Sequence, residues 1–310
     1  TMVLSVIAGI VDGKPLGLAT GAEFLLARTE KNTEPFSEEV NWVAALEWAD
    51  KNGAHIINSS LGYTYHRYFP YQMDGKTTFI SKMANTAVSK GILVVNAAGN
   101  DGDNSWNRIG APADADSILS VGGIDPFTDH KISFSSIGPT ADFRAKPNVA
   151  AYGKVVAAKP KKGLTETYGT SFASPLVAGF VACAKQKYPN QSPLELKKTI
   201  EQSGHLYPFF DYAHGFGIPQ ASKLIYPNKI INPTFSWKRK DNNFEISINE
   251  IETTETFLFN SYDTYLFYNV MNDKGIIHEW GIIGAHENII EIFQHNNWED
   301  AKFINLHYRG

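Results

Sequence analysis

The sequence is poor in cysteine, in excess positive charge and in long apolar runs. Cys183 is the single cysteine, which excludes an internal disulfide and a cysteine zinc cluster; its position predicts a buried site within a helix. The 28 Lys and Arg residues are outnumbered by 32 Asp and Glu residues, and no basic stripe stands out to neutralise phosphates, which argues against a nucleic-acid partner. No apolar run approaches the roughly 18 residues of a membrane span, so none is predicted.

The sequence also lacks an initial methionine and any visible signal peptide. It opens on Thr1-Met2-Val3-Leu4, and no charged segment followed by an apolar one marks an export signal. An apolar pattern typical of a helix starts at the first residue, with no capping turn before it. The sequence therefore looks as if it begins in the middle of a domain.

The composition is that of an ordinary globular protein. Hydrophobic residues make up 43% of the chain and charged residues 19%, which excludes a disordered or collagen-like chain. At roughly 100–200 residues per domain, 310 residues predict about two domains. A change of pattern near residues 230–233 places these domains at 1–228 and 234–310.

The first domain alternates short apolar runs with longer amphipathic ones. Strands are expected at Phe24–Ala27, Ala54–Ile57, Ile92–Val95, Ile118–Val121 and Val155–Ala157, the first of them buried. Helices are expected from Ser37 as N-cap to Gly53, from Phe79 to Lys90, and after the capping box at Ser192. Because strands that alternate with helices form parallel βαβ units, the sequence predicts an α/β fold with a mostly parallel, doubly wound sheet.

The second domain shows the alternation typical of β-strands. Strand-like runs occur at Phe244–Ile248, Thr256–Phe259 and Thr264–Val270, and Asn272–Gly275 is a turn signal. We therefore predict a small antiparallel all-β domain, sandwich-like in form. A stabilising appendage is its favoured role, with substrate capture or surface attachment as the alternative.

The segment Gly169–Pro175 carries the clearest chemical signal. Gly169 allows a tight turn, and Ser171 follows where a long apolar helix begins. Pro175 is tolerated because the first turn of a helix has no internal partners for its N–H groups. A serine there lies beside free backbone donors at the positive helix end, a suitable place to form an oxyanion after attack on a carbonyl. A plain N-cap serine is the alternative.

Asn100 follows the segment Val94–Ala98, which is expected to end a buried strand, in a turn bracketed by Gly99 and Gly102. This position predicts that Asn100 lies at the carboxyl end of a parallel strand, where ligands gather in open α/β sheets. A side-chain amide held there could donate to a developing oxyanion. A turn asparagine that tolerates left-handed geometry is an equally open alternative.

Ser60, Leu61 and Gly62 close another expected strand. The glycine lets a second backbone approach closely, as the addition of an extended peptide strand requires. The loop that follows, residues 63–71, is unusually rich in aromatic residues. It either walls a peptide cleft or folds over the domain's own surface, and we favour the second.

Together these segments resemble the subtilase family of subtilisin-like serine proteases over about residues 1–226. Residues 169–175 match the family's motif G-T-S-x-A-S/T-P throughout, Ala98–Asn100 match its A-G-N, and Ser60–Gly62 match its S-L-G. Lesser landmarks that fit are residues 110–113, 134–139 and 146–151. Two positions depart from the pattern, since the family usually has aspartate at Asn148 and proline at Tyr152; neither is catalytic.

The resemblance implies a serine endopeptidase that acts on peptide or protein substrates through an acyl-enzyme. Ser171 would be the nucleophile and Asn100 the oxyanion donor. By the same resemblance, residues of the substrate channel are Ser60, Leu61 and Gly62 on one wall, Ala97, Ala98 and Gly99 on the other, and Gly110 near the floor. Such small residues suggest a roomy apolar pocket, so we expect a large uncharged side chain before the cut.

The family also requires a histidine base and an orienting aspartate, both earlier in the chain than the serine. Thr1–Gly9 look like the continuation of the family's histidine motif, and residues 17–22 resemble its next landmark. We therefore expect the histidine two residues before Thr1 and the aspartate further upstream, and we expect these 310 residues alone to be inactive. None of the nine histidines present follows a family motif, and His55 is expected inside a strand.

Two functions remain open at this point. The first is a serine endopeptidase, and the alternative is a non-catalytic relative or fragment that binds extended peptides. No cofactor is predicted; subtilases often bind calcium, but the candidate loop aspartates Asp101, Asp103, Asp114 and Asp116 are expected to be solvated, so no metal site is assigned. Family analogy suggests export from a bacterium, into the medium, the periplasm or the cell surface.

Overall fold

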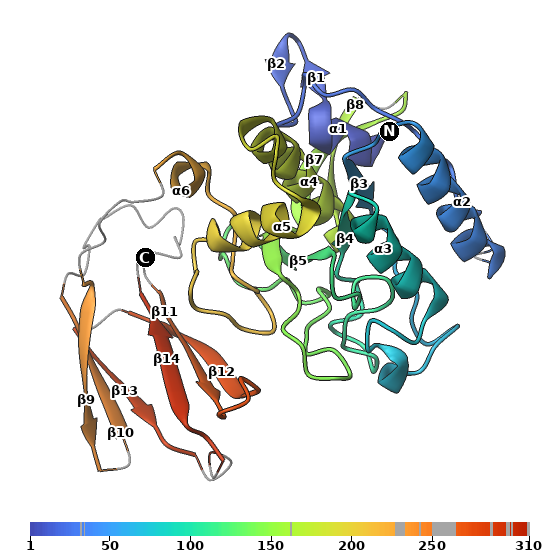
Figure 1. Ribbon diagram of the computed structural model, residues 1–310. Coiled ribbons are helices and arrows are strands. Elements are labelled where there is room, and N and C mark those ends of the chain that lie inside the picture. Colours follow the sequence, from blue (N-terminus) through green and yellow to red (C-terminus); the bar gives the residue numbers. More distant parts are fainter. Residues whose placement is uncertain are drawn as a thin grey trace.

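A four-stranded parallel sheet forms the centre of the molecule in the computed structural model, which describes residues 1–31, 33, 35–161, 163–226, 233–241, 243–249, 265–285, 288–295, 298 and 300–308. Its strand order is β3 (Ile56–Ser59), β4 (Leu93–Ala97), β5 (Leu119–Ile124) and β6 (Val149–Tyr152) (Figure 1). Because all four strands run the same way, their carboxyl ends meet at one edge of the sheet. The segments that begin at Ser60 and Ala98 therefore leave the sheet at that edge.

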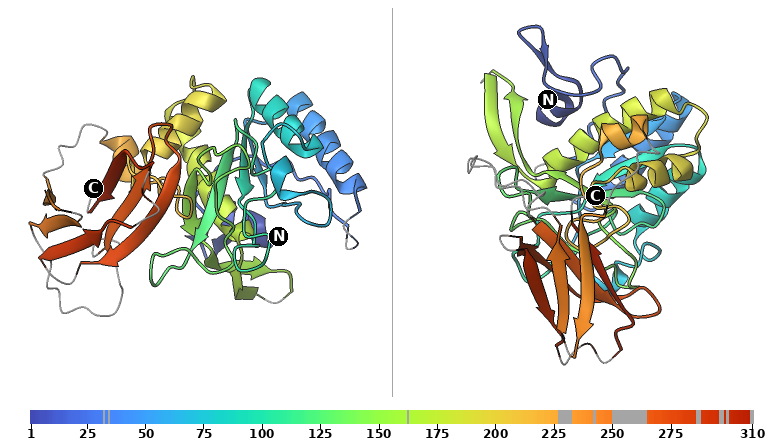
Figure 2. Two further views of the ribbon diagram at one scale, coloured as in Figure 1. Left: turned by 90° about the horizontal axis from the view of Figure 1, so that it is seen from below. Right: turned by 90° about the vertical axis from the view of Figure 1, so that its left-hand side faces the viewer.

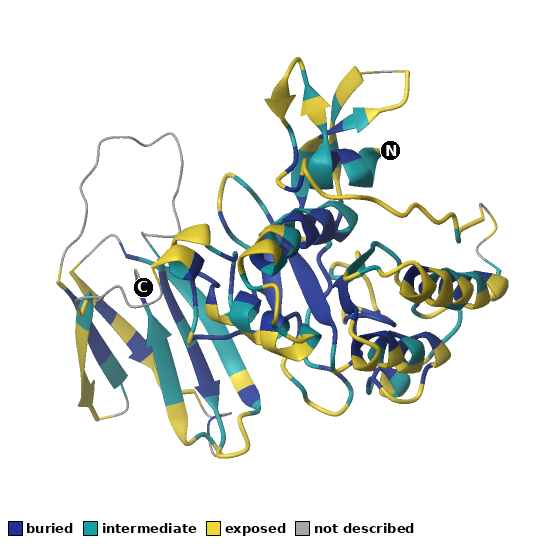
Figure 3. Ribbon diagram, turned by 45° about the horizontal axis from the view of Figure 1, so that its top comes forward, coloured by how far each residue is buried: buried dark blue, intermediate teal, exposed yellow. Residues whose placement is uncertain are grey.

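Helices cover both faces of this sheet, so the predicted doubly wound α/β fold is confirmed. One face carries α2 (Ser37–Lys51) and α3 (Phe79–Ser89), and the other carries α4 (Thr170–Lys187) and α5 (Pro193–Gln202). Side chains of β4 alternate between the two layers: Val94 belongs to the core with α2 and α3, and Val95 to the core with α4 and α5. The strand is buried throughout, which explains why all its residues except Asn96 are apolar (Figure 3).

The capping box at Ser192 is present as predicted, whereas the expected cap at Ser37 is not. The Ser192 hydroxyl accepts from Glu195 N at 3.4 Å, and the Glu195 carboxylate accepts from Ser192 N at 2.8 Å. At the other helix, Ser37 is already the first helical residue and Phe36 occupies the N-cap position.

The smaller elements lie around this sheet. They are α1 (Met2–Ala8), β1 (Ile10–Val11), β2 (Lys14–Pro15), η1 (Pro70–Gln72), β7 (Lys154–Lys159), β8 (Gly163–Tyr168) and α6 (Ala221–Ile225). The strand expected at Val155–Ala157 belongs to an antiparallel hairpin of β7 and β8, not to the parallel sheet. This hairpin is tied to α1, because the Ser5 hydroxyl accepts a 2.9 Å hydrogen bond from Ala158 N. None of the described helices is long and apolar enough to cross a bilayer.

Three predictions of burial are wrong. Phe24–Ala27 form no strand, and Leu26 is 68% exposed, because no described strand pairs with this segment and an apolar run alone cannot satisfy its backbone groups. His55 is exposed, since β3 begins only at Ile56. Cys183 is also exposed, because the buried side of α4 runs through Val177, Val181 and Ala184.

The C-terminal part, hereafter the β unit, consists of two antiparallel three-stranded sheets. One contains β13 (Ile289–Phe293), β10 (Asn243–Ile248) and β9 (Phe235–Lys240), and the other β12 (Ile277–Gly284), β11 (Tyr265–Met271) and β14 (Phe303–His307). Ile246 from the first sheet and Leu266 from the second belong to one apolar core. The predicted all-β character is confirmed; the strand expected at Thr256–Phe259 lies outside the described residues, and the domain limits stay a prediction.

The β unit packs against residues 205–216 of the first part of the chain, on one side of the parallel sheet (Figure 2). Phe267 on β11 lies in a cluster with Leu206 and Phe209, and Asn269 Nδ2 donates to the Phe210 carbonyl at 2.6 Å. Burial lowers the pKa of His205 on this loop to about 3 and that of His307 on β14 to about 4. Both imidazoles are therefore neutral at physiological pH, as an apolar contact surface requires.

Candidate active site

Ser171 lies in the first turn of α4, directly after the hairpin strand β8. Gly169 is the N-cap of the helix, with φ 134° and ψ 151°, a backbone conformation that side-chain-bearing residues rarely adopt. Because of this conformation, only Gly169 separates the end of β8 at Tyr168 from the start of α4 at Thr170. Ser171 is thereby placed where backbone N–H groups have no helical acceptor and the helix end is positive.

Pro175 is not in the first turn, contrary to the sequence prediction. Since α4 begins at Thr170, the proline lies in the second turn, and its missing N–H leaves the Ser171 carbonyl without a helical donor. Ser60 supplies the replacement: its Oγ donates to the Ser171 carbonyl at 2.9 Å, and Ser171 Oγ donates to the Ser60 carbonyl at 3.3 Å. The substrate edge and the nucleophile are thus joined by two reciprocal hydrogen bonds.

Ser60→Ala is expected to lower the free energy of unfolding by about 1 kcal/mol, because it leaves the Ser171 carbonyl in the helix without a donor. Urea unfolding of the purified chain measures this. Ser89→Ala is the matched control: that hydroxyl also donates to a carbonyl of its helix, but at an exposed site where water can replace it. Equal losses in the two variants would contradict the assigned role of Ser60.

Asn100 is oriented by Thr170, the neighbour of the nucleophile. Its Oδ1 accepts from Thr170 N and from Thr170 Oγ1, both at 2.9 Å. Because a backbone N–H can only donate, this contact fixes the oxygen toward Thr170 and turns Nδ2 away. No described residue accepts a hydrogen bond from Nδ2, so the amide is a preoriented donor beside Ser171.

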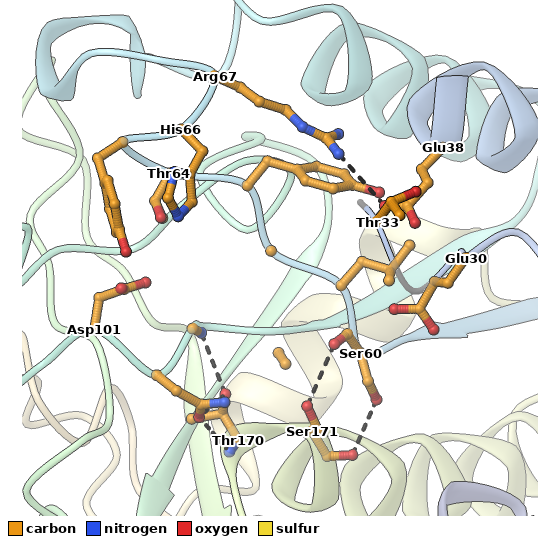
Figure 4. A pocket seen from close by; sticks show the side chains of 17 residues that line it. Glu30, Thr33, Glu38, Ser60, Thr64, His66, Arg67, Asp101, Thr170 and Ser171 are labelled. Atoms are coloured by element: carbon orange, nitrogen blue, oxygen red, sulfur yellow. Dashed lines mark hydrogen bonds and ion pairs between the residues drawn. The ribbon is translucent and has the colours of Figure 1, made fainter. Parts of the chain in front are cut away.

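One cavity of about 710 Å³ brings these residues together (Figure 4). The residues from the sequence analysis that line it are Ser60, Leu61, Gly62, Ala97, Gly99, Asn100 and Ser171. Two residues predicted for the substrate channel, Ala98 and Gly110, do not line the cavity. Ala98 is buried. Gly110 packs so tightly that a Cβ atom there would lie 2.7 Å from Thr64 Cγ2. The substrate-binding roles of all these residues stay predictions.

The wall at Ser60–Gly62 exposes an open backbone edge. Asn96 Nδ2 donates to the Leu61 carbonyl at 3.0 Å and holds the segment in place. The N–H and C=O groups of Gly62, by contrast, make no hydrogen bond with any described residue. An extended peptide could pair with this edge as an added strand.

The cavity is more polar than the small residues of its walls suggested. Glu30, Thr33, Glu38 and Asp101 also line it, and so does the aromatic loop through Thr64, Tyr65, His66 and Arg67. Sequence reasoning missed Glu30 and Glu38, which carry no motif and reach the cavity from a distant segment. Asp101 could have been found from its place directly after Asn100.

The aromatic loop both walls the cavity and folds onto α2, so neither of the two sequence interpretations excludes the other. Arg67 contacts Glu39 Oε1 at 3.1 Å and Glu38 Oε2 at 3.4 Å, and its guanidinium lies 3.8 Å from the centre of the Tyr63 ring. Tyr68 donates to Glu39 Oε2 at 2.6 Å. Burial raises the pKa of Tyr63 to about 12, so its phenol stays neutral. This cluster anchors the loop beside the cavity.

Within the described residues, no histidine or carboxylate is bonded to Ser171 Oγ. His66 lines the cavity but lies with Thr64 at the side away from Ser171 (Figure 4). The buried pair of His214 and Asp211, with Nδ1 and Oδ2 2.9 Å apart, resembles half of a triad. The Nε2 atom of His214, however, already accepts a hydrogen bond from Lys131 N at 3.0 Å, so the His214 imidazole is structural.

Of the four loop aspartates expected to be solvated, Asp114 contradicts the prediction, because it is buried and accepts from Gly75 N and Ser81 Oγ inside the fold. Asp101 accepts from Asn104 Nδ2. No group of three His, Cys, Asp or Glu residues that could hold a metal ion occurs among the described residues.

Ser171 at a helix N-terminus and the Asn100 amide at the carboxyl edge of the parallel sheet thus line one cavity. Residues 1–217 match the model of the subtilase family, peptidase S8, and the chain belongs to that family. It is 35% identical over 175 residues to subtilisin DY of Bacillus licheniformis, covering 56% of this chain and 58% of the relative. It is 31% identical over 213 residues to subtilisin NAT of Bacillus subtilis subsp. natto, covering 67% of this chain and 50% of the relative.

Solved structures agree with the fold. The self-cleaved protease domain of PatA superimposes with a TM-score of 0.59 at 25% identity, over 74% of this chain and 84% of that one. A protease from Pseudoalteromonas arctica superimposes with a TM-score of 0.59 at 24% identity, over 73% of this chain and 70% of that one. The chain spans about half the length of the curated relatives named above.

Proposed function

We propose that this chain is the serine-bearing part of a subtilisin-type serine endopeptidase. The observation that carries the proposal is the juxtaposition of Ser171 Oγ, a preoriented Asn100 amide and the open edge at Gly62 around one cavity. Each group has one task in acyl transfer: nucleophile, oxyanion donor and substrate strand.

In the proposed reaction, a substrate segment pairs with the edge at Gly62 and presents its scissile carbonyl to Ser171. Oγ attacks the carbonyl carbon while a base removes the hydroxyl proton. Negative charge then collects on the carbonyl oxygen, where Asn100 Nδ2 and the N–H groups at the start of α4 donate to it. The amine leaves with a proton returned by the base, and water releases the acyl group from Ser171.

The base and its orienting carboxylate are supplied, in this proposal, by residues outside these 310. The absence of a histidine at Ser171 Oγ among the described residues supports this view. A serine hydroxyl without a base is a weak nucleophile, so the chain by itself would not form an acyl-enzyme at a useful rate. Substrates would be peptides or proteins.

A second candidate is a peptide-binding protein that does not cut. The open edge at Gly62 favours it, because strand pairing there needs neither a base nor a nucleophile. This activity would persist in the isolated chain, whereas hydrolysis would not.

A fluorophosphonate probe tests the proposal. We expect labelling at Ser171 in the complete enzyme, where histidine and aspartate are in place, and none in the isolated chain, because the probe reacts only with an activated serine. Ser171→Ala in the complete enzyme is the control for labelling elsewhere. Rapid labelling of the isolated chain at Ser171 would contradict the idea that the base lies outside it, and failure to label the complete enzyme would leave only the binding function.

Two family properties are carried over as further proposals. Export from a bacterial cell follows from the kinship with bacterial subtilisins. Calcium binding is carried over from the family in the same way, and no site is assigned to it.

A further inference from the structure

We propose that Lys131 is a positioning residue for the oxyanion amide, and that its ammonium group acts through residues 132–136, hereafter the supporting loop. The inference rests on the proposed function and deepens it, because it concerns what holds the amide of Asn100 in place. Lys131 does not line the cavity and is not expected to touch a substrate. Its effect on the reaction would therefore pass through the backbone.

The turn of residues 99–102, hereafter the oxyanion turn, carries Asn100 and is bound on one side by the supporting loop. Ser136 N donates to the carbonyl of Gly99 at 3.0 Å, and Ser136 Oγ accepts from Asp101 N, also at 3.0 Å. The residues before and after Asn100 are thus both hydrogen-bonded to the same serine. The place of the amide therefore depends on the place of the supporting loop.

Gly102 closes the oxyanion turn by packing against the backbone of the supporting loop. Its N–H donates to the Phe134 carbonyl at 2.8 Å. A Cβ atom added at Gly102 would lie 2.1 Å from the Ser135 carbonyl oxygen and 2.9 Å from that of Ser133, closer than real Cβ atoms approach. The turn is therefore in direct contact with these two carbonyl groups.

The ammonium group of Lys131 holds the same two carbonyls. Its Nζ donates to the carbonyl oxygens of Ser133 at 2.7 Å, Ser135 at 3.1 Å and Ile132 at 3.1 Å. Three acceptors need three N–H donors, and only the charged form of lysine supplies them. Because three carbonyl oxygens that converge on one point repel one another, the supporting loop needs a cation there to keep its shape.

Both Lys131 and the supporting loop are anchored to the rest of the protein. Lys131 N donates to His214 Nε2 at 3.0 Å, and His214 Nδ1 lies 2.9 Å from Asp211 Oδ2 in a buried pair. Ser135 Oγ accepts from Gly123 N on β5 at 2.9 Å. The ammonium group therefore joins an anchored backbone to the carbonyls against which the oxyanion turn packs.

Lys131→Met and Lys185→Met form a matched pair of variants, since methionine has a similar length but no N–H donor. Lys185 Nζ also donates to two backbone carbonyls, those of Pro189 and Gln191, both at 2.8 Å. It lies at the opposite end of α4 from Ser171. Both variants are expected to lower the urea midpoint of unfolding by similar amounts, so stability alone does not distinguish them.

Hydrogen exchange in the isolated chain tests the structural step without requiring catalysis. We expect Lys131→Met to accelerate exchange of the backbone amides of Asp101, Gly102 and Ser136 by about tenfold, because each is bonded between the oxyanion turn and the supporting loop. Lys185→Met should leave these rates within about twofold. Unchanged rates in Lys131→Met, or equal acceleration in both variants, would overturn the proposal.

Steady-state kinetics of the complete enzyme test the link to catalysis. We expect Lys131→Met to lower kcat by about tenfold with KM within about twofold, since a displaced Asn100 amide weakens transition-state stabilisation but not peptide pairing at Gly62. Lys185→Met should leave both constants within about twofold. Lys131→Arg keeps a cation with several N–H donors, so it should retain kcat within about threefold, and it replaces Lys131→Met if that variant does not fold.

The outcomes separate the two levels of the proposal. A raised KM with unchanged kcat, or a loss of kcat equal to that of Lys185→Met, would overturn the role of Lys131 in positioning the amide. An unmodified complete enzyme that does not hydrolyse peptides would instead overturn the proposed function, whatever the exchange rates in the isolated chain.

Discussion

Replacing Ser171 with alanine is expected to lower kcat of the complete enzyme by about 10⁶, the loss measured when the corresponding serine is removed from subtilisin. The free energy of unfolding should change by less than about 1 kcal/mol. The physical reason is that Ser171 Oγ makes a single long hydrogen bond, 3.3 Å to the Ser60 carbonyl, and the Ser171 carbonyl keeps its donor from Ser60 in the variant. Hydrolysis of a peptide substrate and urea unfolding provide the two measurements.

Ser174→Ala is the matched control on the same helix. Ser174 is fully buried and donates to Asn58 Oδ1 at 3.0 Å, so its removal should cost about 1 kcal/mol of stability and leave kcat within a few-fold. Comparison of the two variants therefore separates an effect on catalysis from an effect on stability. A Ser171→Ala enzyme that retains near-normal turnover would refute the assignment of the nucleophile.

Asn100→Asp is expected to lower kcat of the complete enzyme by about 10²–10³ with little change in KM. This magnitude is the one known for the oxyanion amide of subtilisin, so it is carried over from a relative. The aspartate has the same shape and can still accept from Thr170 N and Thr170 Oγ1, but it presents no donor and places negative charge beside the oxyanion. Steady-state kinetics with one peptide substrate give kcat and KM separately.

Thr170→Val provides the graded control for this effect. It removes one of the two hydrogen bonds that orient Asn100 but leaves the backbone N–H of Thr170, so we expect a loss of about tenfold in kcat. A larger loss for Thr170→Val than for Asn100→Asp would show that the amide is not the main oxyanion donor.

Most of the fold could be predicted from local patterns. The largely apolar run of β4 and the capping box of Ser192 are local signals, and both identify elements that the structure contains. Phe24–Ala27 show the limit of this reasoning. The same apolar pattern appears there, but whether it becomes a strand depends on a neighbouring strand to pair with, which local sequence does not specify.

The candidate site was predictable in the same uneven way. Ser171 and Asn100 could be located because each lies in a short motif at the end of an element, and the position of a strand or helix end follows from the chain itself. The partners that orient them could not. Thr170 reaches Asn100 across 70 positions of the chain, and Ser60 reaches Ser171 across 111.

The sequence by itself therefore determined the family and the α/β architecture, and it singled out Ser171 and Asn100 as candidates, because these depend on short segments and on the order of elements along the chain. Only the tertiary structure decided how Pro175 is compensated and which distant side chains line the cavity. The physical reason is that a hydrogen bond to an orphaned carbonyl and the lining of a cavity both depend on distance in space. Glu30 and Asp101 are 71 positions apart in the chain, yet they line one cavity.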